Sequence, residues 1–364
     1  MSNVRGALIL VSMGMAVTIG LLGSGVSAAS PTPVPAGNVS ELVSFVPPSA
    51  TSVGFTDWGR IRASQGAEDV TGASPMEDKL PVARSTGKDE AVASGFGTSH
   101  LRDQAATWGW DSFDLDWEAT ITADGPPLWV LRFRDGFDLA PVAARFDERG
   151  FSTTVIDGGT IRSHPLDLAA DWLRATELAI VNTAFLDDGR TLVISSDADQ
   201  VQDVVAHHGT YPDDPALDAT AAALGGASAA LFLMGLGTCQ AFTPIPIDIA
   251  DPFASPLPSL TVTGLHLYAV MGIGYGRPGW DPVGRIVFAY PDAATAQADL
   301  AGRAGLAETG VSQRTGQSYT DALFGVAASH VDGANLTLDV APVNDSPRRL
   351  FEMVFARDMT FAGC

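Results

Sequence analysis

The chain of 364 residues has few cations, since Lys79 and Lys88 are its only lysines and 21 basic residues stand against 42 acidic ones. The resulting net charge of −21 excludes a nucleic-acid binder, because such proteins need cations that displace the counterions of phosphate groups. The same charge disfavours docking on an anionic membrane surface. With 46% hydrophobic residues the chain is nevertheless able to bury a core, so global disorder is excluded as well.

Familiar catalytic motifs are also missing. The sequence has no Gly-x-Ser-x-Gly elbow. The glycines from Gly272 to Gly276 alternate within a strand pattern and open no helix, unlike those of a dinucleotide-binding loop. Neither cysteine is flanked by the cations or histidines that activate a thiol. These absences favour a non-catalytic protein over an enzyme.

Residues 1–29 have the pattern of a secretory signal peptide. Arg5 is the only charge in this segment, residues 7–26 are apolar, and small residues precede a cleavage point after Ala28 or Ala29. The alternative is an uncleaved segment that tethers the protein to a membrane, because about 20 apolar residues just span a bilayer. We expect cleavage and export, with no membrane contact of the remaining chain.

Export makes a disulfide between the two cysteines the expected state. Cys239 ends an apolar run and Cys364 is the last residue, so a bond between them would close a loop of 125 residues. The chain-entropy model gives a loop of this length a stabilisation of about 4–5 kcal/mol. The bond would also hold a C-terminus that otherwise frays.

Two parts of the chain repeat the order strand-strand-strand-helix-strand-hairpin-helix. An Asp-Gly turn between β-branched runs marks the hairpin in each part. This order predicts an α+β fold of two related antiparallel-sheet halves that arose by internal duplication, with the helices on one face of the sheet. In the first half we expect these elements at 52–58, 115–122, 129–135, 139–149, 179–186, 191–196 and 199–208. In the second half we expect them at 229–236, 265–273, 286–292, 293–308, 327–331, 336–341 and 347–359.

Proline-rich segments divide the chain further. We expect a signal peptide at 1–29, a proline-rich tether at 30–48, a first half at 49–239, a proline-rich connector at 240–259 and a second half at 260–364, to which residues 228–238 contribute the first strand. Residues 64–98 are polar and without periodicity, which predicts a mobile loop. The first half is also longer than the second, which indicates one extra helix near residues 166–177.

Three carboxylates near Trp117 occur at alternate positions of the sequence. Alternation along a strand places Asp114, Asp116 and Glu118 on one face of that strand. Carboxylates at this spacing suit Ca²⁺, a hard cation that prefers oxygen ligands. The loop glycine and distal glutamate of a helix-loop-helix calcium site are missing, however. The solvated outer face of an antiparallel strand accounts for the same pattern, so we expect no metal, with calcium as the alternative.

Four of the seven tryptophans fall within 60 residues of one another. Aromatic rings beside carboxylates are typical of sugar-binding sites in extracellular proteins, whereas tryptophans in a small antiparallel core need no ligand. Trp110 together with Asp114, Asp116 and Glu118 is therefore the candidate ligand-binding group.

The sequence supports two hypotheses of different kinds. The first is an exported, soluble and non-catalytic protein that binds a small ligand or a protein partner outside the cytoplasm. The second is an exported hydrolase whose catalytic residues converge only in three dimensions, with Asp114, Asp116, Glu118 and nearby histidines as the first candidates.

Overall fold

The computed structural model describes residues 38–89, 95–96, 101–168, 170–172, 178–235, 238–242, 264–276, 284–346 and 348–364. The expected signal peptide, the first part of the tether and most of the proline-rich connector lie outside these residues. Among the residues described, no helix combines the length and the apolar character needed to cross a membrane.

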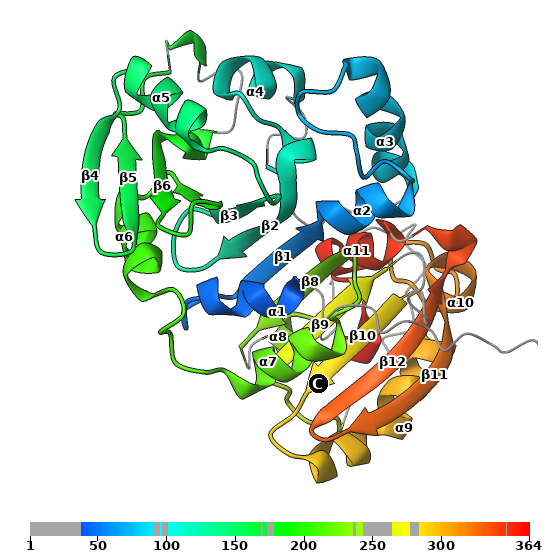
Figure 1. Cartoon of the computed structure of the whole chain (residues 1–364). Helices are drawn as coiled ribbons and strands as arrows, with labels where there is room; N and C mark the ends of the chain where they lie inside the picture. The colour runs from blue at the N-terminus through cyan, green and yellow to red at the C-terminus, as the bar shows by residue number, and fades with distance from the viewer. Residues whose placement is uncertain are drawn as a thin grey trace, which may run out of the picture. The chain divides into compact units, whose positions relative to one another are not determined.

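The strands of the described chain form one antiparallel sheet of twelve (Figure 1). Across the sheet the order is β11-β12-β10-β9-β8-β1-β2-β3-β7-β6-β5-β4. The strands span Ser52–Asp57 (β1), Leu115–Thr122 (β2), Leu128–Phe133 (β3), Ser152–Ile156 (β4), Gly159–Ser163 (β5), Asn182–Leu186 (β6), Thr191–Ser195 (β7), Ala229–Met234 (β8), Val270–Tyr275 (β9), Gly284–Ala289 (β10), Phe324–Asp332 (β11) and Asn335–Pro342 (β12).

Several helices begin at an aspartate that caps them. Asp57, Asp197, Asp214 and Asp292 each accept a backbone N–H of the first turn, so part of the acidic content has a capping role. The α-helices span Val39–Leu42 (α1), Trp58–Ser64 (α2), Met76–Asp89 (α3), Leu101–Trp108 (α4), Ala140–Glu148 (α5), Ala198–His207 (α6), Pro215–Ala223 (α7), Thr238–Ala241 (α8), Ala293–Thr309 (α9), Tyr319–Ala322 (α10) and Arg348–Phe355 (α11). A 3₁₀ helix, η3, covers Ser112–Asp114.

The expected α+β class with an antiparallel sheet is confirmed. The two halves meet where β1 pairs with β8, for example at Phe55 and Ala230. Outward from this pair, the strand order is β1-β2-β3-β7-β6 on one side and β8-β9-β10-β12-β11 on the other. The connectivity of the halves is therefore alike, while their origin by duplication stays a prediction. Beyond β6, the first half carries the additional strand pair β5 and β4, formed by residues 152–163. The extra helix expected near 166–177 falls largely outside the described residues and stays a prediction.

Helices cover both faces of the sheet, and the expectation of helices on one face is wrong. Along β10, Ile286 lies in the apolar cluster of α9 and α11, whereas the next residue, Val287, lies in the cluster of α7. In the first half, Phe146 of α5 packs on one face and Val201 of α6 on the other. The reason is that most strands are apolar on both sides, so each face needs cover.

Two segments are more ordered than expected. Val39 and Leu42 of α1 are buried, so the tether expected at 30–48 gives way to packed structure from residue 38 on. The region expected as a mobile loop contains α3, which buries Lys79 and Val82. Propensity did not predict α3 because its stability comes from packing of a few side chains against the neighbouring segment.

The C-terminus is held at several points. Cys239 and Cys364 form the expected disulfide, with their Cα atoms 5.5 Å apart. The fully buried guanidinium of Arg303 donates to the backbone oxygens of Phe361 at 2.8 Å and Gly363 at 3.1 Å. The last residues are therefore part of the core of the second half.

Candidate functional site

The carboxylates of β2 do not share one strand face. The register between β2 and β3 shifts between Leu115 and Trp117, as in a β-bulge. As a result, Leu115 packs on one face of the sheet and Trp117 on the other, although they are two residues apart. The alternation expected from the sequence is thus interrupted at Asp116, and the expected solvated carboxylate face is wrong.

Asp114 is buried and has a structural role. Its Oδ1 accepts the backbone N–H of Gly72 at 2.8 Å, and its Oδ2 accepts that of Asp111 at 3.2 Å. Burial raises the pKa of Asp114. Next to it, Lys79 forms a buried ion pair with Asp111, with Nζ 2.7 Å from Oδ2. These contacts join the segment that leads into α3 to the start of β2.

Asp116 lies in a different environment. Its Oδ2 is 3.8 Å from the Arg190 guanidinium, and the side chain is partly exposed. Asp57, the N-cap of α2, is nearby and buried; burial raises the pKa of Asp57 to about 6, against its hydrogen bond from the Arg60 backbone N–H. Among the described residues, no histidine forms an ion pair or hydrogen bond with Asp114, Asp116 or Glu118.

Glu118 and Trp110 lie in one apolar region. Glu118 is fully buried, and both of its oxygens lie 3.1 Å from the backbone nitrogen of Phe96. Burial raises the pKa of Glu118 to about 8, although the Phe96 N–H and the Trp58 side chain lower it. The Phe96 ring stacks on Trp110, with 6.0 Å between ring centroids. Trp110 is 1% exposed, so its ring has no face for a sugar at the surface.

The four predicted site residues therefore form no common site. Trp110 and Glu118 are joined through Phe96, whereas Asp114 completes the capping box of η3 with Asp111 and Asp116 faces Arg190.

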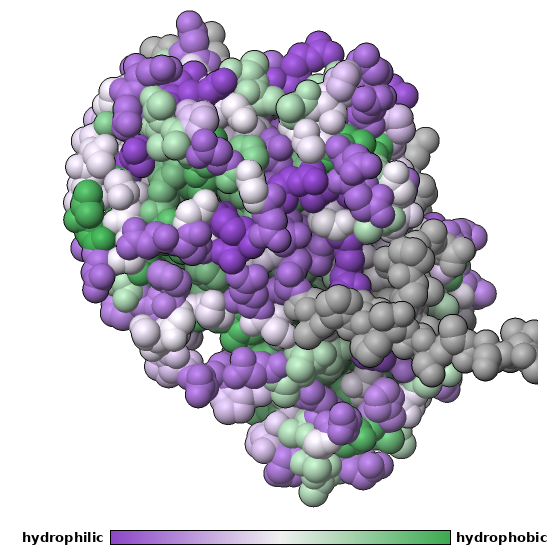
Figure 2. All heavy atoms as spheres, in the orientation of Figure 1, coloured by the Kyte–Doolittle hydropathy of each residue, from purple (hydrophilic) through white to green (hydrophobic). Residues whose placement is uncertain are grey.

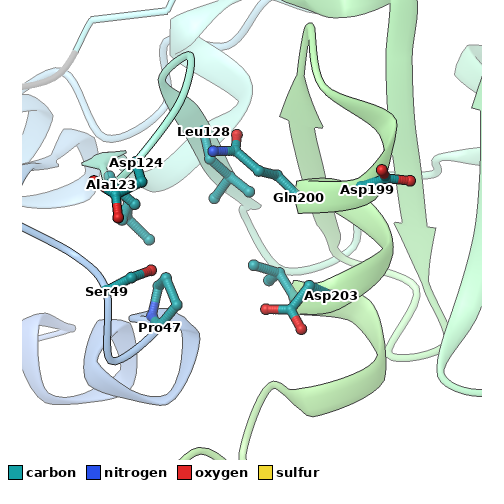
Figure 3. A pocket seen from close by; sticks show the side chains of 10 residues that line it. Pro47, Ser49, Ala123, Asp124, Leu128, Asp199, Gln200 and Asp203 are labelled. Atoms are coloured by element: carbon teal, nitrogen blue, oxygen red, sulfur yellow. The ribbon is translucent and has the colours of Figure 1, made fainter.

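A surface pocket that the sequence did not indicate lies between α6, the β2–β3 turn and the segment before β1 (Figure 3). Its volume is about 250 Å³. The floor consists of Ile121, Leu128 and Val204, which are core residues of the sheet and of α6. Figure 3 shows Gln200 and Asp203 pointing from α6 toward the cavity, while Asp199 points away from it. The pocket thus has an apolar floor and a polar rim.

Hydrogen bonds within the protein fix the polar side chains at the rim of the pocket. Asp203 Oδ2 accepts the Tyr211 hydroxyl at 2.8 Å. Gln200 Oε1 accepts the Ser195 hydroxyl at 3.0 Å, which leaves the amide NH₂ of Gln200 for other partners. Gly125 makes room for that amide, because a Cβ at this position would lie 2.6 Å from Gln200 Nε2. On the opposite wall, Asp124 is exposed and, among the described residues, accepts no hydrogen bond.

The sequence contains one local signal for this pocket. Gln200 and Asp203 are three residues apart and therefore lie on one side of α6, the side that faces the pocket. Their relation to Asp124 and Ser49 arises only because α6 packs beside the β2–β3 turn, which no local pattern predicts.

A second arrangement lies in the other half of the sheet. His266 Nδ1 is 2.6 Å from Oδ1 of Asp299, which is 1% exposed, while the His266 ring is about half exposed. Asp299 Oδ2 also accepts the Tyr290 hydroxyl at 2.9 Å. A buried carboxylate that orients an imidazole is one part of a nucleophilic catalytic site. Among the described residues, no hydroxyl or thiol hydrogen-bonds to Nε2 of His266.

No family model and no curated protein matches the chain. Among solved structures, it is similar to the protein TP0453 in crystal form I, with 10% identity, a TM-score of 0.38, and coverage of 87% of this chain and 97% of that one. Crystal form IV of TP0453 gives 9% identity and a TM-score of 0.39, with coverage of 82% and 91%. At these values the likeness assigns neither a family nor an activity to this chain.

Proposed function

We propose that the chain is an exported binding protein whose pocket between α6 and the β2–β3 turn takes a primary ammonium group on a short apolar stem. The observation that carries this proposal is the pairing of an apolar floor, made by Ile121, Leu128 and Val204, with the carboxylates of Asp124 and Asp203. An amphipathic cation is the chemistry that satisfies both parts of such a pocket.

Export is supported by the disulfide between Cys239 and Cys364, because such bonds persist mainly in oxidising compartments. The signal-peptide pattern of residues 1–29 supports the same conclusion. Fractionation of producing cells tests it: the chain should be recovered outside the cytoplasm with a mass that corresponds to cleavage after Ala28 or Ala29. Full-length chain that stays in the membrane fraction would instead support an uncleaved anchor.

Pocket size and exposure limit the affinity. A volume of about 250 Å³ lies below the usual range of small-molecule sites, so it suits a stem of a few carbons. Four buried methylene groups contribute about 3 kcal/mol, and an exposed ion pair contributes about 0.2–1 kcal/mol. These contributions total about 4 kcal/mol, and binding also costs translational and rotational freedom, so the Kd should be no tighter than about 1 mM.

Titration with n-butylammonium, followed by heteronuclear NMR shifts, tests the proposal. We expect saturable binding to the unmodified chain and about threefold weaker binding to Asp203→Asn and to Asp124→Asn, because each loses one carboxylate of the rim. Glu148→Gln is the matched control, since it removes an exposed carboxylate from α5, outside the pocket. Equal binding of n-butanol, or equal weakening by Glu148→Gln, would contradict the proposal.

The ammonium group has two sources, a free amine or a lysine side chain of a protein partner. A lysine-containing peptide distinguishes them: tighter binding of the peptide than of n-butylammonium, lost in Asp203→Asn, indicates a protein partner. Equal binding of both indicates a small amine.

The alternative function, an exported hydrolase, is favoured by one observation, the contact between His266 and the buried Asp299. In that case the chain hydrolyses an activated ester, and His266→Gln abolishes the activity and its pH dependence while the fold persists. If the unmodified chain and His266→Gln both leave the ester intact, this alternative is wrong.

A further inference from the structure

The second half contains a cavity of about 380 Å³ between α11 and the connection from α9 to β11, which includes α10. Figure 1 shows these elements in orange and red, away from α6, which lines the first pocket. Arg314, Arg348 and Arg349 line this cavity together with hydroxyl groups such as that of Ser346. In a chain with 21 basic and 42 acidic residues, three arginines at one cavity are a local reversal of charge.

The three guanidinium groups differ in how many of their N–H donors already have a partner within the protein. Arg314 is exposed and, within the described part of the chain, has no hydrogen-bond or ion-pair partner. Arg349 donates one N–H to the backbone oxygen of Ala322 and keeps its remaining donors. Arg348 is ion-paired with Glu352 through Nε at 2.7 Å, which leaves its terminal nitrogens. Guanidinium donors from three arginines therefore remain available around one space.

The carboxylates at this cavity are already engaged. Asp358 is 4% exposed; it accepts the Ser312 hydroxyl and, at 2.7 Å, the backbone N–H of Gln313. These bonds hold the 312–315 turn, and with it Arg314, beside α11. Glu352 faces Arg348. The acidic groups thus position two of the arginines, and they leave an excess of positive charge for a ligand.

We infer that this cavity is a binding site for an oxyanion of the phosphate or sulfate class. Planar guanidinium groups match the oxygens of such anions with paired hydrogen bonds, and they stay charged at every physiological pH. The inference is independent of the proposed amine pocket, which lies on α6 and has the opposite charge.

Sulfate titration at constant ionic strength, with chloride as the exchanged anion, tests the inference. We expect saturable NMR shifts for residues of the 312–315 turn and of α11 with sulfate and with inorganic phosphate, and none with chloride. Arg314→Gln should weaken sulfate binding about threefold to tenfold, since it removes the least satisfied guanidinium. Arg84→Gln is the matched control, because Arg84 is an exposed arginine of α3 and lies outside the cavity.

Circular dichroism of Arg314→Gln should match that of the unmodified chain, since the side chain is exposed. A phosphoserine peptide compared with inorganic phosphate separates the sources of the anion: tighter peptide binding assigns the group to a larger molecule, and equal binding assigns it to the free ion. Equal responses to sulfate and chloride, or equal affinities of Arg314→Gln and the unmodified chain, would overturn the inference.

Discussion

Lys79 and Asp111 form an ion pair of 2.7 Å in which both side chains are almost completely withdrawn from water. One of only two lysines in the chain is thus used to hold α3 against the start of β2. Removing one partner of a buried pair leaves an unpaired charge in the interior, which costs more than the pair itself contributes.

Lys79→Met should therefore lower the free energy of unfolding by about 3–5 kcal/mol. Urea denaturation followed by tryptophan fluorescence measures this change. Adding Asp111→Asn to Lys79→Met removes the unpaired charge and should restore part of the stability. Arg84→Met, an exposed change on the same helix, serves as the control and should stay within about 0.5 kcal/mol. A loss of equal size in both single variants would contradict the role of the pair.

Glu118 should make stability depend on pH. Burial raises its pKa from the usual 4.5 to about 8, so the folded state binds a proton that the unfolded state has lost between these values. The free energy of unfolding should accordingly fall as pH rises from about 4.5 to about 8, by up to about 5 kcal/mol. Glu118→Gln should flatten this part of the curve. Urea midpoints of both chains at pH 5 and pH 8 measure this effect. If the free energy of unfolding of Glu118→Gln depends on pH as strongly as that of the unmodified chain, the prediction is wrong.

Asp57 offers an internal comparison for that experiment. The pKa of Asp57 is raised to about 6, so its contribution is present below its usual value of 3.8 and is lost as pH rises to about 6. Asp57→Asn should change the pH dependence of the free energy of unfolding below pH 6. Between pH 6 and pH 8 this dependence should be unchanged, because there it comes from Glu118.

Reduction of the disulfide should destabilise the second half of the sheet. Cys239 and Cys364 are 125 residues apart, and the double serine variant should lose about 2–5 kcal/mol. Intact mass should increase by two hydrogens on reduction, and thermal melting should occur at a lower temperature. Arg303 still holds the C-terminal residues through two backbone oxygens, so the reduced chain should remain folded at 25 °C.

The outer strand β4 should tolerate charge. Val155 is 77% exposed at this edge of the sheet, and Figure 2 shows an isolated hydrophobic area over β4. Val155→Lys should change the free energy of unfolding by less than about 0.5 kcal/mol and should reduce light scattering in concentrated solution, since a charged edge pairs less readily with another strand. Val193→Lys, at a fully buried position of β7, should instead prevent folding.

Local features of the fold followed from the sequence where neighbouring residues decide them. The Asp-Gly turns place Gly189 between β6 and β7 and Gly333 between β11 and β12, both at positive φ, as the hairpin pattern predicted. The helices expected at 139–149 and 293–308 correspond to α5 and α9. Such features depend on the turn or the periodicity of a few consecutive residues.

The candidate site was much harder to predict from the sequence. A single bulge between Leu115 and Trp117 reverses which side chains face which layer, and a period-two pattern does not reveal it. The pocket on α6 requires that Asp203 face Asp124, which is 79 residues earlier in the chain. Sequence alone does not specify this proximity.

By itself, the sequence determined a strong excess of acidic residues and predicted an antiparallel α+β chain, an export signal and a disulfide between Cys239 and Cys364. Only the tertiary structure decided that one continuous sheet joins the halves through β1 and β8, that helices cover both of its faces, and that Lys79 and Glu118 are interior. The physical reason is that turns and caps depend on adjacent residues, whereas burial of a charge depends on which distant segments pack around it.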